Sequence, residues 1–284
     1  MRSTHALAVG LALMGGAAGP AAAWGPEGHS IVAEIAQRRL TPEAAAMVAH
    51  LLGTGHSLAA IASWADDIRD QRPETYNWHF VDIPLATPKY DAARDCKLDP
   101  KKGDCIVLAL GRIDKDLRCG SDEKKVDALK FAVHFLGDIH QPLHTVLEAL
   151  GGNKVRVGVL MHGRTCTGTC EPTLTTSNLH AAWDVDLIRA TVWDWGHYVD
   201  RLESGWLQGA EATKPGIDGG TPEAWANETH GYAPIVWSER PADDVLGDAY
   251  YNAVLPILDR QLGVAGLRLA RFLNEAAAAK CTGN

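Results

Sequence analysis

The sequence predicts a single all-α domain that carries a small β-hairpin and is stabilised by disulfide bonds. Helix-start signals, in which Ser, Thr or Asn stands before the segment and in several cases is followed by Pro or acidic residues, recur along the chain before segments with helical apolar spacing. Strand-like alternation occurs in one segment, 154–161 (KVRVGVLM). No internal repeat or low-complexity tract divides the 284 residues, a length that suits one large domain.

The expected helices follow their start signals in order. Thr41, Ser57, Ser121, Asn178 and Thr221 each stand before a helical pattern. The patterns with clear limits cover 58–68, 124–140, 179–192, 251–262 and 264–279. Stretches rich in Gly and Pro predict loops at 84–104, 151–172 and 214–222, and Gly168 is the expected turn of the hairpin.

The first 23 residues have the pattern of a secretory signal peptide. Arg2 precedes an apolar stretch, and Pro20 and three alanines follow it, as before a signal-peptidase site. An N-terminal membrane anchor is the alternative. Cleavage after Ala23 would leave a mature domain of residues 24–284 that begins with Trp24, and it would place the protein in the periplasm or outside the cell.

The six cysteines fit an exported protein, because an oxidising compartment permits disulfides. Six cysteines allow 15 pairings. Short loops favour Cys96–Cys105 and Cys166–Cys170, which leaves Cys119 to pair with Cys281. Metal binding by the C-x-x-x-C segment is the alternative, but that segment lacks a second matching pair.

Charge and hydropathy exclude two classes of protein. The formal net charge is −8, so the chain lacks the basic footprint that duplex-binding proteins usually carry. No apolar run has the roughly 18–20 residues that a membrane-spanning helix needs, which excludes a polytopic membrane protein. We expect a monomer with no stable membrane association.

Two His–Asp pairs have the spacing of metal ligands on helices. His134 and Asp138 are four residues apart, as are His180 and Asp184, so each pair can share one helix face and close on one ion. His144 lies just past a proline that should end the first of these helices and turn it toward the same region. A single pair of this kind is more often a surface pair or a cap contact. Two copies and a third histidine favour a metal site inside a helical bundle.

Taken together, the motifs resemble those of a known family. WGPEGH, WADDIR, HFVD, HFLGDIHQPLH, GGN and NLHAAWD occur in the order found in the tri-zinc single-strand nucleases of the S1/P1 type, which include plant nuclease I and bacterial members. The resemblance runs from Trp24 to Asp184. It implies an all-α fold that is shared with zinc-dependent phospholipase C. Phospholipase C activity is the alternative function, because that enzyme has the same N-terminal Trp and metal cluster.

The resemblance implies three Zn²⁺ ions and nine ligand residues. Asp66, His79 and His134 resemble the ligands of the first ion, and Asp138 resembles the carboxylate that bridges it to the second. The amino and carbonyl groups of Trp24, together with His29, resemble the remaining ligands of the second ion. The third ion would be held by His144, His180 and Asp184. Asp67 is the rival of Asp66, and His140 is expected as a supporting or surface histidine.

Further residues gain roles from the resemblance. Arg69 resembles an arginine that contacts the scissile phosphate. Asp82 resembles an aspartate that lies beside the cluster and has a catalytic role. Phe80 resembles an aromatic residue that stacks on a base. Asp104 lies in the loop between Cys96 and Cys105, where it could bond to a base edge or simply be solvated.

The predicted function is a secreted or periplasmic hydrolase. Zn²⁺ lowers the pKa of bound water to about 7, so metal-bound hydroxide would attack the phosphorus. The substrates implied are single-stranded DNA, RNA and 3′-nucleotides, and the products 5′-phosphorylated. Stacking on an aromatic side chain requires an unstacked base, which explains a preference for single strands. Metal ions would also concentrate positive charge within an acidic protein.

Overall fold

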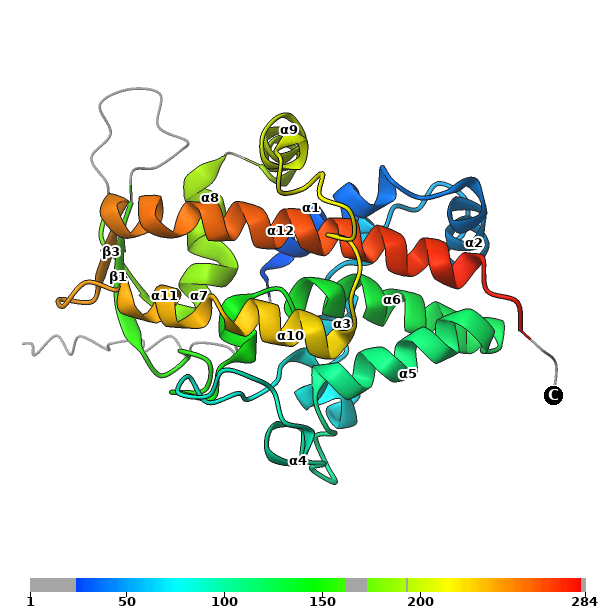
Figure 1. Cartoon of the computed structure of the whole chain (residues 1–284), viewed down its shortest axis with the longest axis horizontal. Helices are drawn as coiled ribbons and strands as arrows, with labels where there is room; N and C mark the ends of the chain where they lie inside the picture. The colour runs from blue at the N-terminus through cyan, green and yellow to red at the C-terminus, as the bar shows by residue number, and fades with distance from the viewer. Residues whose placement is uncertain (1–23, 162–172, 193, 282–284) are drawn as a thin grey trace, which may run out of the picture.

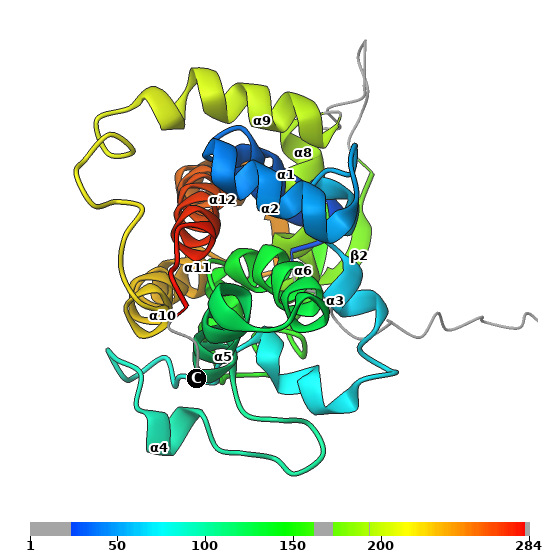
Figure 2. The ribbon, with the colours of Figure 1, turned by 90° about the vertical axis from the view of Figure 1, so that its right-hand side faces the viewer.

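The longest helix, α12 (Asp248–Ala277), runs along the length of the molecule in the computed structural model (Figure 1). The structure describes residues 24–161, 173–192 and 194–281. Viewed along its axis, α12 lies beside α1 (Pro26–Gln37) and above α5 (Ile106–Cys119) and α6 (Asp122–Asp138), and it packs against all three (Figure 2). The prediction of an all-α domain with disulfides is confirmed.

Shorter helices cover the ends and flanks of this bundle. In chain order they are α2 (Pro42–Leu52), η1 (Ala59–Ile61), α3 (Trp64–Asp67), η2 (Pro73–His79), α4 (Ala92–Asp95), η3 (Pro142–Thr145), α7 (Leu179–Ala181), η4 (Ala182–Asp186), α8 (Leu187–Thr191), α9 (Trp195–Ser204), η5 (Trp206–Gln208), α10 (Pro222–His230) and α11 (Ala233–Ser238). As predicted, the hydroxyls of Thr41 and Thr221 cap α2 and α10. No helix in the described part of the chain is long and apolar enough to cross a membrane.

A small sheet closes one end of the bundle. Strand β1 (Arg156–Leu160) pairs antiparallel with β2 (Thr175–Asn178), as the predicted hairpin requires. A third strand that the sequence did not suggest, β3 (Val245–Gly247), pairs with β1 in parallel. Three residues are too few for an alternation pattern to be recognised. Gly168, the expected turn, lies outside the described residues.

Two helix predictions need correction. The pattern at 58–68 forms two short turns, η1 and α3, because the chain breaks at Ala62, whose carbonyl accepts a hydrogen bond from His134 Nδ1 at 2.7 Å. The segments 251–262 and 264–279 form one continuous helix. The glycines there serve close packing: a Cβ at Gly266 would collide with Ile35 of α1.

Two of the three favoured disulfides are present. Cys96 pairs with Cys105, and Cys119 at the end of α5 pairs with Cys281 in the C-terminal segment. The pair Cys166–Cys170 lies outside the described residues. The first disulfide closes the loop that follows α4, and the second attaches the end of the chain to α5.

Candidate metal centre

Eight of the predicted ligand side chains come together in three groups. Within each group, one nitrogen or oxygen atom per residue lies within 4.8 Å of the others. The groups are His29, His134 and Asp138; Asp66, His79 and His134; and His144, His180 and Asp184. Because these side chains come from seven separate elements, their convergence follows from the fold and not from local spacing alone.

Asp138 joins the first two groups. Its Oδ1 lies 3.3 Å from His29 Nε2, while its Oδ2 lies 3.1 Å from His79 Nδ1 and 3.3 Å from His134 Nε2. The carboxylate is fully buried at the last residue of α6. With its two oxygens directed at different histidine sets, it is placed to bridge two cations.

The third group contains two histidines whose nitrogens face each other. His144 Nδ1 donates to the carbonyl of His79, and His180 Nδ1 donates to the carbonyl of Gly151, both at 2.7 Å. Each ring therefore presents an unprotonated Nε2, and the two Nε2 atoms are 3.1 Å apart. Backbone carbonyls that fix the tautomer in this way are the usual support of metal-bound histidines.

Local backbone features place these ligands. Pro142 begins η3 after a short turn, so His144 approaches the cluster as predicted. Asp184 lies in the π-helical turn η4, a form that is common at functional sites. The Gly151 carbonyl reaches His180 because Gly151 adopts φ +59°, and a Cβ there would collide with the Leu143 carbonyl.

Gln141 supports the third group. Its Nε2 donates to Asp184 Oδ1 at 2.7 Å, and its Oε1 accepts from the backbone of Leu143. The side chain thereby connects the turn after α6 to η4 and leaves the second Asp184 oxygen facing His180 at 3.5 Å. Sequence reasoning missed this role, although Gln141 lies within the motif HFLGDIHQPLH.

Trp24 lies behind the cluster and is completely buried. Its indole nitrogen donates to the carbonyl of Gly137 at 2.8 Å, which attaches the first described residue to α6 next to Asp138. The next residue, Gly25, donates its backbone N–H to the carbonyl of Asp184. These bonds hold Trp24 and Gly25 between two of the three groups. Ligation by its amino and carbonyl groups stays a prediction.

Unpartnered buried atoms test whether cations fit this site. Among the described residues, thirteen buried side-chain nitrogen and oxygen atoms have no hydrogen-bond partner, and seven of them belong to the predicted ligands. They are His29 Nδ1 and Nε2, Asp66 Oδ1, His79 Nε2, His134 Nε2, Asp138 Oδ1 and Asp184 Oδ2. Leaving such atoms unsatisfied is costly, and coordination to a cation would offset that cost. The donors are nitrogen and oxygen only, a set that suits Zn²⁺.

Electrostatics favour the protonation states that metal binding needs. Burial lowers the pKa of His29, His79 and His144 well below the usual value and that of His180 to about 4. These imidazoles are therefore neutral near pH 7 and offer a lone pair.

The buried carboxylates show the opposite effect. Burial raises the pKa of Asp138 to about 7 and that of Asp184 well above its usual value. Burial also lowers the pKa of His134, but the carboxylates of Asp138 and Asp66 outweigh it and raise the pKa to about 9. Without cations, these three residues therefore hold protons more readily than usual. Bound cations would replace those protons as the positive charge that balances the carboxylates.

Arg69 stands at the edge of the cluster with its side chain 11% exposed. One guanidinium nitrogen lies 4.0 Å from Asp66 Oδ1, and another donates to the carbonyl of Tyr76 at 3.2 Å. Of the two candidate aspartates in this turn, Asp66 faces the cluster and Asp67 is exposed. Arg69 thus places a fixed positive charge beside the first group.

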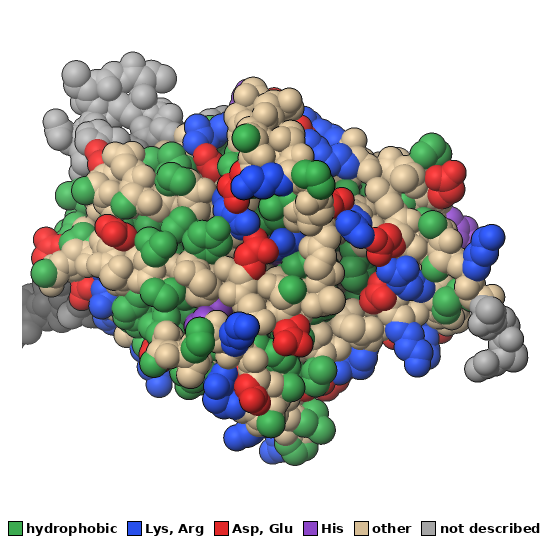
Figure 3. All heavy atoms as spheres, in the orientation of Figure 1, with side chains coloured by type: hydrophobic (Ala, Val, Ile, Leu, Met, Phe, Trp, Pro, Cys, Tyr) green, Lys and Arg blue, Asp and Glu red, His purple; other side chains and the backbone are tan. Residues whose placement is uncertain are grey.

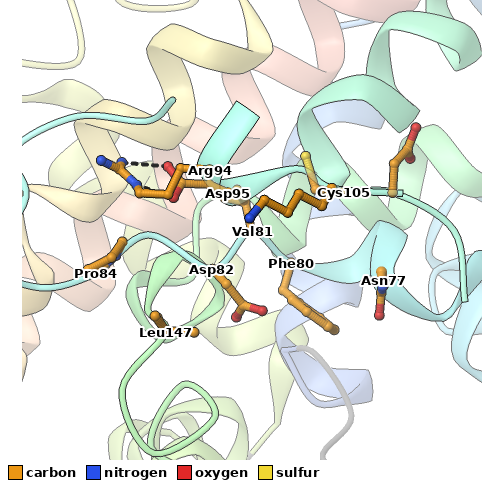
Figure 4. Close-up of a pocket in the computed structure, with 11 residues that line it drawn as sticks. Asn77, Phe80, Val81, Asp82, Pro84, Arg94, Asp95, Cys105 and Leu147 are labelled. Carbon is orange, nitrogen blue, oxygen red and sulfur yellow. Dashed lines mark hydrogen bonds and ion pairs between the residues drawn. The ribbon is translucent and has the colours of Figure 1, made fainter. Parts of the chain in front are cut away.

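A pocket of about 220 Å³ opens next to this region (Figure 4). Phe80 and Asp82 are two residues apart in the sequence and both line it together with Leu147; in the view of Figure 4, Asp82 lies between Phe80 and Leu147. Asp104 also lines the pocket, and both its oxygens accept hydrogen bonds from Arg112 at 2.6 and 2.7 Å. Burial and the charge of Asp95 raise the pKa of Asp82 to about 6.

The remaining candidate, His140, is completely buried and so is not a surface residue. Its Nδ1 bonds to the carbonyl of Leu136, and its Nε2 accepts from Arg268 of α12. It belongs to none of the three metal-ligand groups. Its contacts attach the turn after α6 to the central helix.

Comparison with known proteins shows to which family this chain belongs. The model of the family described as S1/P1 Nuclease matches residues 24–278. Nuclease P1 of Penicillium citrinum is 30% identical, over 89% of this chain and 97% of its own length. Endonuclease 5 of Arabidopsis thaliana is 29% identical (90% of this chain and 91% of its own length), as is Nuclease S1 of Aspergillus oryzae (88% and 91%). The predicted enzyme class, a hydrolytic nuclease, is confirmed: the chain belongs to the S1/P1 nuclease family.

Proposed function

We propose that this protein is a zinc-dependent phosphodiesterase that hydrolyses single-stranded DNA and RNA to 5′-phosphorylated products and that also acts as a 3′-nucleotidase. The observation that carries the proposal is the convergence of three His/Asp groups beside a pocket lined by Phe80. Family membership supports the nuclease over the phospholipase C alternative. Bound to these groups, Zn²⁺ would supply Lewis acidity at the phosphate and an activated water for hydrolysis.

The protein's own residues would bind and orient the substrate. Arg69 is placed to hold the non-bridging oxygens of the scissile phosphate and to balance the charge that develops there. Its contacts with the Tyr76 carbonyl and Asp66 fix the guanidinium before substrate arrives. Asp138 would hold two cations at a fixed separation through its two oxygens.

The pocket supplies a reason for the preference for single strands. The Phe80 ring offers a stacking surface that only an unpaired base can reach, and such stacking contributes about 1–3 kcal/mol with little base preference. Asp82 lies beside that ring, so in addition to its predicted catalytic role it is placed to bond to a base edge. The Asp104 carboxylate keeps free lone pairs for the same purpose, although it is already paired with Arg112.

The surface is consistent with contact to one strand at a time. On the face shown in Figure 3, basic and acidic side chains are interspersed, without a broad basic area. We further propose that the protein is exported as a monomer after removal of residues 1–23. The family model begins at residue 24, which supports cleavage at that point.

The test uses the mature protein, beginning at Trp24. We expect about three Zn²⁺ per chain by elemental analysis, and hydrolysis of single-stranded DNA, RNA and a 3′-nucleotide that a chelator abolishes and added zinc restores. Duplex DNA should be cut slowly and phosphatidylcholine not at all. Fewer than two zinc ions per chain, or activity untouched by chelation, would overturn the proposal.

A further inference from the structure

Beyond the metal centre, two cations and an aromatic ring form a cluster beside the predicted scissile position. The guanidinium carbon of Arg69 lies 4.1 Å from the centre of the Tyr76 ring, and Lys102 Nζ lies 4.9 Å from the same centre. The two cationic groups are therefore at most about 9 Å apart. Such cation–π contacts stabilise each cation near the ring. Tyr76 also meets Phe80 edge to face, with ring centres 6.4 Å apart.

The position of Lys102 is built into the loop that bears it. Its carbonyl accepts from the backbone N–H of Asn77 in η2 at 2.9 Å, and its own N–H donates to Asp99 Oδ1 at 3.0 Å. The next residue, Gly103, has φ +86°, and a Cβ there would collide with the carbonyl of Glu74. The Cys96–Cys105 disulfide closes the same loop. The loop is thus fixed against η2, which also carries His79.

Lys102 is exposed, and in the described part of the chain no carboxylate forms an ion pair with its ammonium group. Its charge acts, without such a pair, on the nearby Asp99. By contrast, Arg112 and Arg94, the nearby arginines of this region, are both paired with aspartates. Lys102 is therefore available to an anion that approaches alongside Arg69.

A nucleic-acid strand offers that second anion. Phosphates follow each other about every 3.4 Å of rise on one strand of a duplex and farther apart in an extended single strand. If Arg69 holds the scissile phosphate, an ammonium group within about 9 Å of it can reach a neighbouring phosphate of the same strand. A 3′-mononucleotide has no such phosphate.

We propose that Lys102 and Tyr76 form a subsite for the phosphodiester that flanks the scissile bond. Lys102 contacts the flanking phosphate and so favours polymeric substrates, whereas Tyr76 is a positioning residue that holds Arg69 in place. This inference rests on the proposed nuclease function.

The test of Lys102 compares Lys102→Gln with Lys101→Gln in the zinc-loaded mature enzyme. Lys101 is an exposed neighbour in the same loop, and no ring contact of its ammonium group is seen among the described residues. Lys101→Gln therefore removes the same charge as Lys102→Gln without affecting the proposed subsite. We expect Lys102→Gln to raise KM about 5–10-fold for a short oligothymidylate and to leave a 3′-nucleotide unaffected. For a non-cleavable phosphorothioate oligonucleotide, a plot of log binding constant against log salt concentration should become less steep by about 0.7 in Lys102→Gln. That is the value expected for the loss of one phosphate contact on a single strand. Lys101→Gln should change neither.

Equal losses on both substrates, or identical behaviour of the two lysine variants, would overturn the role of Lys102. If the wild type cleaved neither substrate, the proposed function would fail. The binding measurement would still decide whether Lys102 contacts the strand.

The test of Tyr76 separates its ring from its hydroxyl. Tyr76→Leu should lower kcat about 10-fold on both substrates because Arg69 loses its ring contact, with zinc content unchanged. Tyr76→Phe keeps the ring and should restore kcat. Full kcat in Tyr76→Leu, or a loss in Tyr76→Phe as large as in Tyr76→Leu, would overturn the positioning role.

Discussion

The Nε2 atoms of His144 and His180 lie 3.1 Å apart. Both rings donate through Nδ1 to backbone carbonyls, so in the neutral rings neither Nε2 atom carries a proton. Two nitrogen lone pairs at that distance repel each other unless a proton or a cation lies between or beside them. Burial lowers the pKa of both rings, so a proton is disfavoured at neutral pH. The carboxylate of Asp184 belongs to the same group as these two rings and completes a set of three donors for one cation.

Removal of one of these rings should remove one metal ion. We expect His180→Ala to retain about two of three Zn²⁺ ions, measured by elemental analysis of protein dialysed against excess zinc. His56→Ala, which alters an exposed histidine outside the three groups, is the control and should retain all three. Three ions in His180→Ala would show that this residue is not a ligand.

Asp138→Asn should have a larger effect, because the Asp138 oxygens face two groups of histidines. An amide keeps the shape but loses the charge and one oxygen donor, so we expect loss of about two ions and of essentially all hydrolytic activity. The matched variant Asp184→Asn should lose only one ion. If Asp138→Asn kept full activity, Asp138 would not bridge.

The predicted role of Trp24 as the N-terminal residue and a metal ligand can be tested without altering a side chain. Trp24 is buried and its indole nitrogen is bonded to the Gly137 carbonyl, and two extra residues before it would convert the predicted amino ligand into a peptide N–H. We expect a Gly-Ser extension at this end to cost one zinc ion and most activity, whereas the same extension after Asn284 should cost neither. Full zinc content in the N-terminally extended protein would remove Trp24 from the ligand set.

Asp82 provides a pH-dependent prediction. Its pKa rises to about 6 in the folded protein from about 4 in an unfolded chain, so the folded state favours the protonated form. The favourable contribution is complete below pH 4 and is lost as pH rises through 6. Asp82→Asn should therefore match the wild type in stability near pH 4 and exceed it by about 1–2 kcal/mol at pH 8, after allowance for partial exposure.

Thermal unfolding of both proteins across this pH range, at constant zinc, measures the difference. A constant gap between variant and wild type, independent of pH, would show that Asp82 does not titrate in this way.

Helical periodicity predicted those parts of the site that lie on one element. His134 and Asp138 share a face because they are four residues apart on α6, and the turn at Pro142 follows from its missing backbone donor. The position of His29 relative to Asp138 came only from the resemblance, because nothing local connects α1 to the end of α6.

Backbone contacts between distant segments could not be predicted. The Ala62 carbonyl is available to His134 only because the expected helix at 58–68 breaks, and no breaking residue marks that point. The contact of Lys102 with Tyr76 likewise depends on how a 10-residue disulfide loop folds back on η2. Such contacts depend on tertiary structure, which overrides local propensity.

Gly151 tests whether this backbone support matters for the metal. Gly151→Ala would place a Cβ against the Leu143 carbonyl and 3.2 Å from His180 Nδ1, in a residue with φ +59°. We expect a loss of about 1–3 kcal/mol of stability and reduced occupancy of the third zinc site. Gly216→Ala is the matched control, because Gly216 has φ +82° but open space around it. It should lose some stability from backbone strain and keep all three ions. Equal zinc content in both variants would show that the Gly151 carbonyl does not determine the geometry of His180.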